Sequence, residues 1–432
     1  MPRVVIVGGG WSGCGAAVTA RQAGAEVVIL ERTDSLLGTG LVGGIMRNNG
    51  RYTAAEEMIA LGAGELFHLC DANSRHRNMT FPGHRHASLY DVAWMEQIVR
   101  KRLLEMGVEI WLLARVNGLD RRDGSVRSVV LENGTAIDGD VFVDATGSFG
   151  PQSFCAEFGN GCAMCVMRCP TFGPRVSVVG LTGIAEKRGG RADGSIGAMS
   201  GSCEFSKETM APHLVEELER TGVLVIPLPK ENVDKSKLAA KCCQQYASDE
   251  YAENVVLLDT GRVKLMTAHM PLDKLRRVPG LENVRYDDPY AGTVGNSMRY
   301  AALSPRDDAM QVVGPVDNLF CGGEKAGLLV GHTEAIVTGS VAGHNAVRRA
   351  LGQELLTLPD TLAVGDAITH VRVRMQKEEG MREKYTFSGA GYFKRMKELG
   401  LYSADDAAIR ARVARTGLAG VLAAPVARRK AA

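Results

Sequence analysis

The first thirty residues alternate short apolar runs with a stretch of helical spacing. Residues 4–7 and 26–30 are mostly apolar, and small residues recur at helical spacing over 14–22. A glycine-rich turn joins the first apolar run to the helical stretch. This order predicts a strand, a turn, a helix and a second strand, which together form one βαβ unit of a parallel sheet.

Both periodicities continue along the chain after a glycine-rich, irregular stretch over 38–50. Period-two and apolar runs predict strands over 108–113, 128–131, 141–143 and 318–321, with Asn133-Gly134 as a hairpin turn. Helical spacing predicts helices over 54–70, 91–106, 206–221, 235–249, 333–351, 365–384 and 404–422. A chain of 432 residues is too long for one small core, so we expect two interleaved domains and an appended tail.

The composition is that of an ordinary globular protein. Lys and Arg number 51 against 49 for Asp and Glu, and this net charge of +2 gives no general field for nucleic acid. The sequence contains no run of about 18 apolar residues, so we expect no membrane span. The N-terminus enters a strand-like stretch rather than a signal peptide, so we expect a cytoplasmic protein. In the cytoplasm, the ten cysteines would more often act as metal ligands or redox thiols than form disulfides.

The first turn has the pattern of a dinucleotide-binding site. Gly8, Gly10 and Gly13 form a GxGxxG motif between the first strand and helix. Gly8 permits the tight turn, Gly10 lets the backbone approach a pyrophosphate, and Gly13 lets the helix pack on the strand. The helix N-terminus directs amides and a positive dipole end at the phosphates. Glu31, at the end of the second strand, would accept hydrogen bonds from ribose hydroxyls.

Three further segments resemble the glutathione-reductase-type flavoprotein superfamily. Residues 141–147 are similar to its "ATG" strand, 318–323 followed by Glu324 to its second flavin-contacting segment, and 333–347 to the helix directed at the flavin. The resemblance implies FAD as the cofactor. The cofactor contacts that the motif and the resemblance together imply are Gly8, Gly10, Ser12, Gly13, Glu31, Arg32, Gly44, Val116, Ala145, Thr146, Gly147, Gly323, Glu324, Gly331 and His332.

Residues 278–284 and 319–345 are most similar to tRNA-modifying flavoproteins of the GidA and folate-dependent methyltransferase type. The stretch 1–150 instead resembles the FAD-dependent oxidoreductases of anaerobes, which are related to heterodisulfide-reductase-type flavoproteins. The tRNA enzymes carry a cysteine in the glycine-rich loop after the second strand, whereas 40–46 holds none here. Methyl transfer to uridine would therefore lack its nucleophile, and only the flavin scaffold carries over.

The expected fold class is α/β. It consists of a Rossmann-like FAD-binding domain, with a parallel sheet in three-layer ββα packing, an inserted mixed α+β substrate domain and a helical C-terminal tail. We predict the FAD-binding domain over 1–150 and 255–352, the inserted cysteine-rich substrate domain over 151–254, and the tail over 353–432.

Four cysteines lie close together in the segment after the "ATG" strand. Cys155, Cys162, Cys165 and Cys169 are spaced C-x6-C-x2-C-x3-C, and Pro170 follows. The last part matches a bacterial ferredoxin run, so a [4Fe–4S] cluster is the leading interpretation. A structural zinc site and a redox dithiol at Cys162 and Cys165 remain open alternatives.

The candidate catalytic residues are His332, which opens the helix expected to face the flavin, and the thiols Cys162 and Cys165. Further candidates for binding or protonating a substrate are Arg47, Asn48, His84, Arg85, His86, Arg168 and Arg175. Cys14 and Cys321 occupy small-residue positions in the flavin-contacting turns and are expected to pack in the core.

The sequence therefore predicts an FAD-dependent oxidoreductase that moves electrons between flavin, a cysteine-ligated cluster and a small-molecule substrate. No second GxGxxG follows a strand, so the electron donor would be NAD(P)H docking directly at the flavin, a redox partner protein, or the substrate itself. A homo-oligomer is compatible with this prediction. The alternatives are an RNA-modifying flavoprotein, with Arg121, Arg122, Arg276, Arg277 and Arg285 on an RNA-binding surface, and an electron-transfer subunit.

Overall fold

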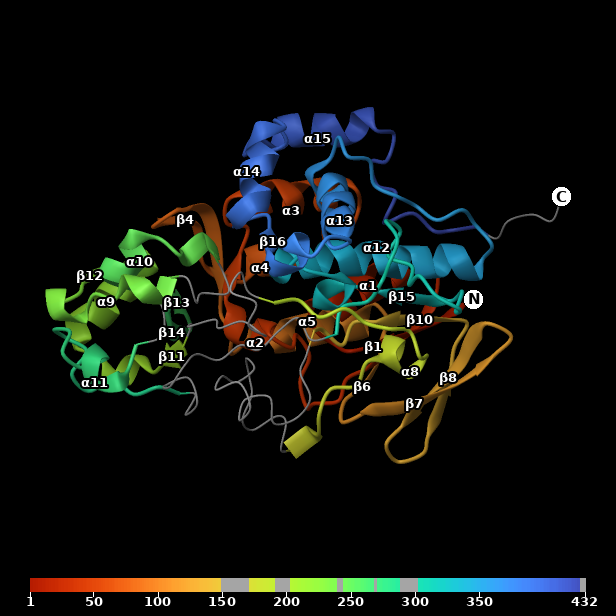
Figure 1. Cartoon of the computed structure of the whole chain (residues 1–432), viewed down its shortest axis with the longest axis horizontal. Helices are drawn as coiled ribbons and strands as arrows, with labels where there is room; N and C mark the ends of the chain where they lie inside the picture. Colours follow the sequence, from red (N-terminus) through yellow and green to blue (C-terminus); the bar gives the residue numbers. More distant parts are fainter. Residues whose placement is uncertain (149–170, 191–202, 239–243, 268–269, 288–301, 428–432) are drawn as a thin grey trace.

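The computed structural model describes residues 1–148, 171–190, 203–238, 244–267, 270–287 and 302–427. Its centre is a sheet of five parallel strands (Figure 1). Their order is β15 (Leu319–Cys321), β10 (Val141–Asp144), β1 (Arg3–Val7), β2 (Glu26–Leu30) and β6 (Glu109–Trp111). Because all five strands run the same way, their carboxyl ends meet at one edge of the sheet. This edge contains the predicted FAD-binding residues described below.

One face of the parallel sheet is covered by α1 (Trp11–Gln22) and α12 (His332–Ala350). The two helices pack at backbone distance through small residues. A Cβ added to Gly339 would lie 2.1 Å from the Ser12 carbonyl oxygen, and one on Gly343 would lie 2.1 Å from the Ala16 carbonyl oxygen. Glycine is therefore required at both positions, because any side chain there would push α12 away from α1.

A meander of three antiparallel strands lies on the opposite side of the sheet in Figure 1. Its strands are β7 (Val116–Arg122), β8 (Ser125–Leu131) and β9 (Ala136–Asp138), and the predicted Asn133-Gly134 turn joins the last two. Parallel sheet, helices and meander form the three layers that the sequence predicts, so the Rossmann-like fold class is confirmed.

A second unit is built on two antiparallel sheets. The larger has the order β11 (Cys203–Phe205), β14 (Arg262–Leu265), β13 (Asn254–Thr260) and β12 (Val223–Pro227), and the smaller β3 (Ile45–Met46), β5 (His84–Tyr90) and β4 (Ser74–Phe81). One hydrophobic cluster of this unit extends from Phe205 to Val284. The unit thus continues beyond the boundary predicted at 254, because β13 and β14 pair with β12 and β11 rather than with the parallel sheet.

The C-terminal tail packs against the helices of the first unit. It contains α13 (Ala363–Arg374), α14 (Ala390–Glu398), α15 (Asp406–Arg415) and the short strand β16 (Tyr385–Thr386). Helices α13 and α15 contact α3 (Gly50–Ala60), as Figure 1 shows at the top of the molecule. The remaining helices are α2 (Gly40–Gly43), α4 (Glu65–Ala72), α5 (Met95–Glu105), α8 (Val178–Leu181), α9 (Pro212–Thr221), α10 (Asp249–Glu253) and α11 (Leu272–Leu275). The 3₁₀ turns η1 to η6 are Lys207–Thr209, Lys230–Asn232, Lys235–Leu238, Gln244–Tyr246, Gly323–Ala326 and Glu379–Arg382.

Several predicted elements differ from the structure. The helix expected over 54–70 is two helices, α3 and α4, because Gly62 adopts a positive φ between them. The described part of 235–249 contains two 3₁₀ turns and the first residue of α10, so a continuous helix is wrong there. Hairpin β4–β5 and helix α14 were not predicted. No helix in the described part of the chain is long and apolar enough to cross a membrane.

Helix α12 contains a histidine that should make the fold sensitive to acid. His344 is 1% exposed, and neither ring nitrogen has a hydrogen-bond partner in the described structure. Burial, followed by the nearby Arg348, lowers the pKa of His344 to about 4. The unfolded chain therefore binds the proton more readily than the folded chain does. Stability contributed by the neutral ring is present above the ordinary histidine pKa, about 6.5, and is lost as the pH falls toward 4.

We expect His344→Leu to reduce the loss of unfolding free energy between pH 7 and pH 5 by about 2 kcal/mol. The measurement is urea unfolding of the wild type and the variant at both pH values. His213→Gln, an exposed substitution in α9, serves as the control and should leave the pH dependence unchanged. An unchanged pH dependence in His344→Leu would show that His344 is not the group responsible.

Candidate functional site

The GxGxxG turn separates glycines that the fold requires from one that it does not. Gly8 has φ +102°, and a Cβ there would lie 2.5 Å from the Ala145 carbonyl oxygen. A Cβ on Gly13 would lie 1.9 Å from the Gly8 carbonyl oxygen. By contrast, a Cβ on Gly10 would meet only the Leu37 carbonyl oxygen, at 3.9 Å, among the residues that the structure describes. The space above Gly10 is thus open, where the sequence predicts a pyrophosphate.

The turn after β15 closes onto the start of α1. Gly323 has φ +68°, and its backbone N–H donates to Thr338 Oγ1 at 2.8 Å. A Cβ on Gly322 would lie 2.5 Å from Ser12 Oγ. This hydroxyl is buried and makes no hydrogen bond to the described residues. A buried hydroxyl without a partner is a place for a ligand acceptor.

The acidic residue predicted to bind the ribose lies at the end of β2. Glu31 Oε2 accepts a hydrogen bond from the Gly9 N–H at 2.8 Å, and Oε1 accepts one from the Thr33 N–H at 2.9 Å. Each carboxylate oxygen retains a lone pair for a ribose hydroxyl. The adjacent Arg32 is directed elsewhere, because its Nη1 donates to the Gly173 carbonyl oxygen at 2.7 Å. Val116 is buried in β7 opposite Leu131.

The "ATG" strand ends in a fully buried carboxylate. Asp144 Oδ1 accepts from the Thr146 N–H at 3.1 Å and from Thr146 Oγ1 at 2.7 Å, which fixes the turn through Ala145 to Gly147. Asp144 Oδ2 lies 3.9 Å from Lys325 Nζ, and this ammonium also pairs with Glu186. Lys325 is fully buried in the second flavin-contacting segment. Lys325 was not among the predicted residues, because nothing local to position 325 indicates that its partners lie at 144 and 186.

His332 is the first residue of α12, as predicted, and lies over the glycine-rich loop. A Cβ on Gly43 would fall within 1.6 Å of its ring carbon. The Tyr90 hydroxyl lies 3.5 Å from His332 Nδ1 and donates to the Gly40 carbonyl oxygen at 2.7 Å. Gly44, at the end of the loop, adopts a positive φ and lies against Thr260 of the second unit. His332 and Gly44 therefore lie together where the two units meet.

A buried ion pair beside α12 was not predicted. Arg51 Nε donates to both carboxylate oxygens of Glu334, at 3.0 and 2.9 Å, and the Glu334 side chain is fully buried. Glu334 also accepts from Thr386 Oγ1 at 2.6 Å and from the Phe387 N–H at 2.8 Å. A Cβ on Gly331 would meet the Arg51–Glu334 pair, so glycine is needed there. The tail thus contributes directly to the end of α12 expected to face the flavin.

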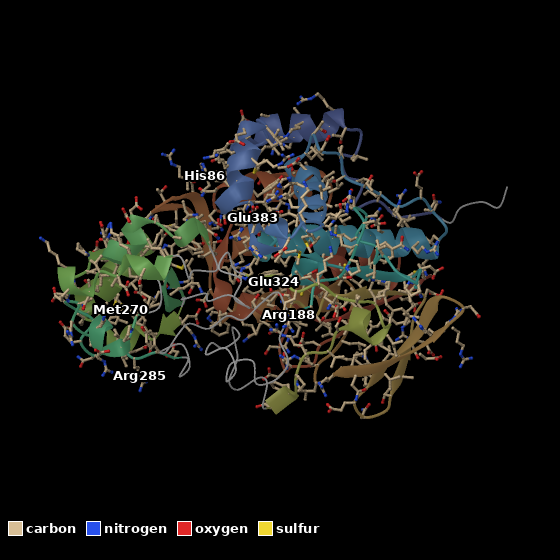
Figure 2. All side chains as sticks on the ribbon, in the orientation of Figure 1. His86, Arg188, Met270, Arg285, Glu324 and Glu383 are labelled. Atoms are coloured by element: carbon tan, nitrogen blue, oxygen red, sulfur yellow. The ribbon has the colours of Figure 1, made fainter. Side chains whose placement is uncertain are left out.

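These residues fit a bound dinucleotide. The open space at Gly10, the buried Ser12 hydroxyl, the Glu31 carboxylate and the "ATG" turn lie along one edge of the parallel sheet. In open α/β sheets this is the edge at which dinucleotides bind. Figure 2 shows Glu324, which accepts from Ser148 Oγ at 3.0 Å, near the middle of the molecule below α12.

The cysteine segment lies outside the described residues, and so does Arg168. Cys155, Cys162, Cys165 and Cys169 are therefore known only from the sequence. No group of metal-ligating side chains is found elsewhere in the described part of the chain. Cys14 and Cys321 are fully buried, and burial raises the pKa of both thiols, that of Cys321 to about 12. Packing is thus the role that their surroundings support.

Most of the other candidate substrate residues have partners within the protein. Arg47, a candidate for binding a substrate, is buried and pairs with Glu56 and Asp71, so its charge is engaged within the protein. His84 is buried in strand β5, and Asn48 Nδ2 lies 2.9 Å from its Nδ1. Arg85 also belongs to β5, and its backbone N–H donates to Asn49 Oδ1.

The arginines considered for RNA binding do not form one surface. Arg121 and Arg122 lie on β7, whereas Arg276 and Arg277 follow α11 in the second unit, where Figure 2 labels Arg285. Figure 1 places β7 and α11 at opposite ends of the molecule. The five side chains therefore cannot form one basic track toward the flavin site.

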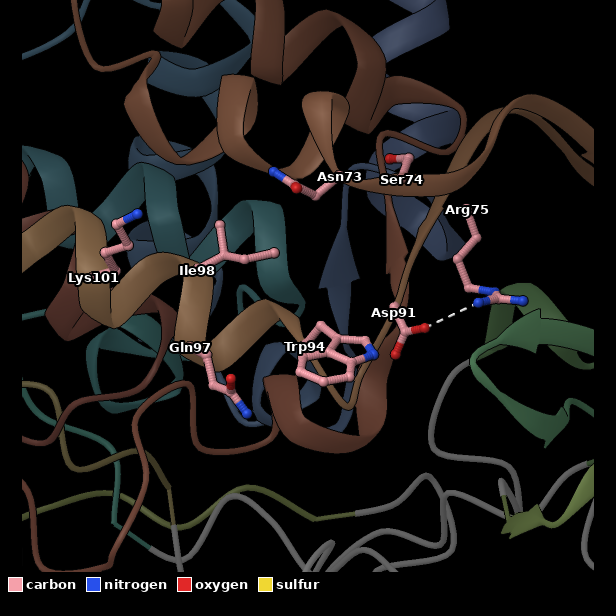
Figure 3. A pocket seen from close by; sticks show the side chains of 8 residues that line it. All are labelled: Asn73, Ser74, Arg75, Asp91, Trp94, Gln97, Ile98 and Lys101. Carbon is pink, nitrogen blue, oxygen red and sulfur yellow. Dashed lines mark hydrogen bonds and ion pairs between the residues drawn. The ribbon is translucent and has the colours of Figure 1, made fainter.

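A separate surface pocket of about 560 Å³ lies beside α5 (Figure 3). Its walls include the indole of Trp94, which is 60% exposed, and the ion pair between Arg75 and Asp91. The other lining residues are Asn73, Ser74, Gln97, Ile98 and Lys101. None of the predicted cofactor residues lines this pocket.

Comparison with known proteins supports the predicted resemblance. A family model described as FAD dependent oxidoreductase matches residues 3–148, and the model of glucose inhibited division protein A matches 252–354. The methylenetetrahydrofolate–tRNA-(uracil-5-)-methyltransferase TrmFO of Bacillus velezensis is 35% identical over 106 residues, which are 24% of this chain and 23% of that protein. The tRNA uridine 5-carboxymethylaminomethyl modification enzyme MnmG of Chlorobaculum tepidum is 35% identical over 106 residues, 24% of this chain and 16% of that one.

Among solved structures, GidA of Aquifex aeolicus in its form II crystal has a TM-score of 0.65 at 17% identity. The similarity covers 98% of this chain and 73% of that one, so the fold is shared along nearly the whole chain. The matches to the curated relatives cover less than a quarter of their length. The predicted combination of an FAD-dependent oxidoreductase segment with a GidA-like segment is confirmed.

Proposed function

We propose that this chain, with its FAD-dependent oxidoreductase and GidA-like segments, is a flavoenzyme that moves electrons between FAD, an iron–sulfur cluster and a small-molecule substrate. The observation that carries the flavin assignment is the carboxyl edge of the parallel sheet. There, Gly10 leaves open space beside the buried Ser12 hydroxyl, which has no partner among the described residues. Bound FAD would supply the two-electron chemistry.

The protein's own residues would hold and tune the flavin and the substrate. Gly10, Ser12, Glu31 and the turn through Thr146 would hold the dinucleotide part. The N-terminal amides of α12 would face the flavin ring, where a positive dipole end stabilises negative charge. His332 is proposed to hold or deliver a proton at an imidazole nitrogen. The buried Arg51–Glu334 pair would fix this helix end.

Both flanks of the cysteine segment support a cluster beside the flavin. Before the segment, Ser148 hydrogen-bonds to Glu324. After it, Arg32 and Arg115 donate to the carbonyl oxygens of Gly173 and Pro174, at 2.7 and 2.9 Å. The described residues on both sides of the cysteine segment thus contact the same edge of the sheet. Their ferredoxin-like spacing favours an iron–sulfur cluster over zinc or a redox dithiol.

The test is an absorption spectrum of the anaerobically purified protein, combined with iron, sulfide and zinc analysis. We expect flavin bands, a broad shoulder near 400 nm, and about four irons and four sulfides per chain. Cys165→Ser should remove the iron and the shoulder and keep the flavin, while Cys70→Ser, at a buried cysteine of α4, should keep both. Flavin without iron would refute the cluster, and failure to bind added FAD would refute the flavoenzyme.

The similarity of 252–354 to GidA favours one second candidate, an RNA-modifying flavoprotein. The relatives' names specify tRNA uridine as their substrate. The missing cysteine in 40–46 and the separated arginines speak against transferring that activity. Binding of tRNA that weakens steeply with salt, together with modification of uridine, would favour this candidate over the oxidoreductase.

A further inference from the structure

Arg175 lies at the carboxyl edge of the parallel sheet. Among the described residues, its Nη1 is the only heavy atom within 4 Å of the position that a Cβ on Gly147 would take, at 3.9 Å. Gly147 ends the "ATG" turn, and Ala145 in the same turn touches Gly8 of the glycine-rich turn. Arg175 and Gly10 therefore belong to the same edge of the sheet, at the ends of the neighbouring strands β10 and β1.

The guanidinium of Arg175 has no counter-charge in the described structure. No hydrogen bond or ion pair to a described residue holds it, although the side chain is half-buried. The nearest fixed carboxylate on this strand, Asp144, is already engaged by Thr146, Val179 and Lys325. A half-buried cation without a partner is unfavourable, so this position favours an anion.

The segment that carries Arg175 is held firmly in place. Arg32 donates to the Gly173 carbonyl oxygen, and Arg115 donates to the Pro174 carbonyl oxygen. Each of the two residues before Arg175 thus accepts one hydrogen bond from an arginine. Arg115 also pairs with Glu132 at 2.8 Å. Two arginines thus fix the backbone and leave the third guanidinium free. Such preorganisation favours bidentate binding of a phosphate.

We propose that Arg175 binds the pyrophosphate of the dinucleotide, as a charged ligand in addition to the GxGxxG amides. This assignment rests on the proposed FAD site. It places Arg175 at the phosphates rather than at the flavin ring, because the predicted ring neighbours Gly44 and His332 lie around α2 and Tyr90 instead. Arg175 would then bind the cofactor rather than the substrate, for which the sequence made it a candidate.

The test compares the affinities of FAD and ADP for the apoprotein by titration calorimetry. ADP carries the diphosphate without the flavin ring. We expect Arg175→Met to weaken the binding of both ligands by the same factor, about tenfold or more. The affinities of Arg175→Lys should lie between those of the wild type and Arg175→Met. The salt dependence of ADP binding should become less steep in Arg175→Met. Arg115→Met is the matched control, because it removes a clamp on the same segment and leaves Arg175 in place.

Unchanged affinities in Arg175→Met would overturn the assignment, and so would a loss for FAD without a loss for ADP. An equal loss in Arg115→Met would assign the effect to the position of the segment instead. Circular dichroism of each apoprotein should match the wild type, which separates binding from folding. A wild-type chain that binds neither ligand would refute the proposed FAD site itself, whereas wild-type binding with an unaffected Arg175→Met refutes only Arg175.

Discussion

Replacing Gly10 with alanine is expected to weaken FAD binding by at least about 100-fold and leave the fold intact. Gly10 has φ −66° and ψ −179°, a conformation open to alanine, and the added methyl would meet no atom of the described residues closer than 3.9 Å. The methyl would instead occupy the space in which we expect the pyrophosphate. Gly13→Ala should instead destabilise the fold, because its Cβ would overlap the Gly8 carbonyl oxygen at 1.9 Å. We expect Gly13→Ala to lower the free energy of unfolding by about 3 kcal/mol or more.

The measurement pairs FAD titration with urea unfolding of the apoproteins. The contrast between the two variants is the result that matters, since both remove a glycine of the same motif. If Gly10→Ala bound FAD as tightly as the wild type does, the pyrophosphate could not bind at this turn. A Gly13→Ala protein as stable as the wild type would show that α1 can move away from β1 at little cost.

Arg51→Met is expected to destabilise the protein by about 3–5 kcal/mol. The substitution leaves the fully buried Glu334 carboxylate without its counter-charge, and within the described part of the chain Thr386 Oγ1 and the Phe387 N–H remain as donors. The exposed pair Arg349–Asp317, with side chains 41% and 52% exposed, is the control. We expect Arg349→Met to cost less than about 1 kcal/mol, because water screens that pair.

Adding Glu334→Gln to Arg51→Met tests the physical cause of the loss. The neutral amide oxygen still accepts from Thr386 and Phe387, so the double variant should recover a large part of the lost stability. Urea midpoints of the wild type, both single variants and the double variant complete the cycle. If the double variant were no more stable than Arg51→Met, the loss would come from packing of the arginine side chain rather than from buried charge.

The parallel sheet and its glycine turns were predicted from the sequence because their signals are local. Strand β1, the Gly8–Gly13 turn and α1 follow one another, so periodicity and spacing identify them. The start of α12 was predicted at 333 from the same local signals, and the helix begins at His332. These elements define most of the predicted cofactor edge.

Hairpin β4–β5 gave no such signal. Residues 74–80 are largely polar and half-exposed, and Asn78 and His86 adopt positive φ values with shifts in register. A strand without a buried face lacks the period-two pattern. The strand that contains His84 was therefore not predicted, although His84 lies buried against Phe81 and Tyr246.

The buried charges could not be predicted because their partners are distant in sequence. Arg51 meets Glu334 across 283 positions, and Lys325 meets Glu186 across 139. A lone lysine or glutamate in a sequence is expected at the surface. Only the folded chain shows that these charges join the cofactor edge to the tail and to the segment after the cysteines.

The contacts of Thr386 and Phe387 with Glu334 also make the tail part of a thermodynamic linkage. A ligand that binds only the folded state stabilises everything that must be ordered for binding. If FAD requires the end of α12, it also requires the tail residues that hold Glu334, and tail opening and cofactor release become one coupled equilibrium. Protease cleavage in the C-terminal tail should therefore report how much of the protein in a cell extract carries its flavin.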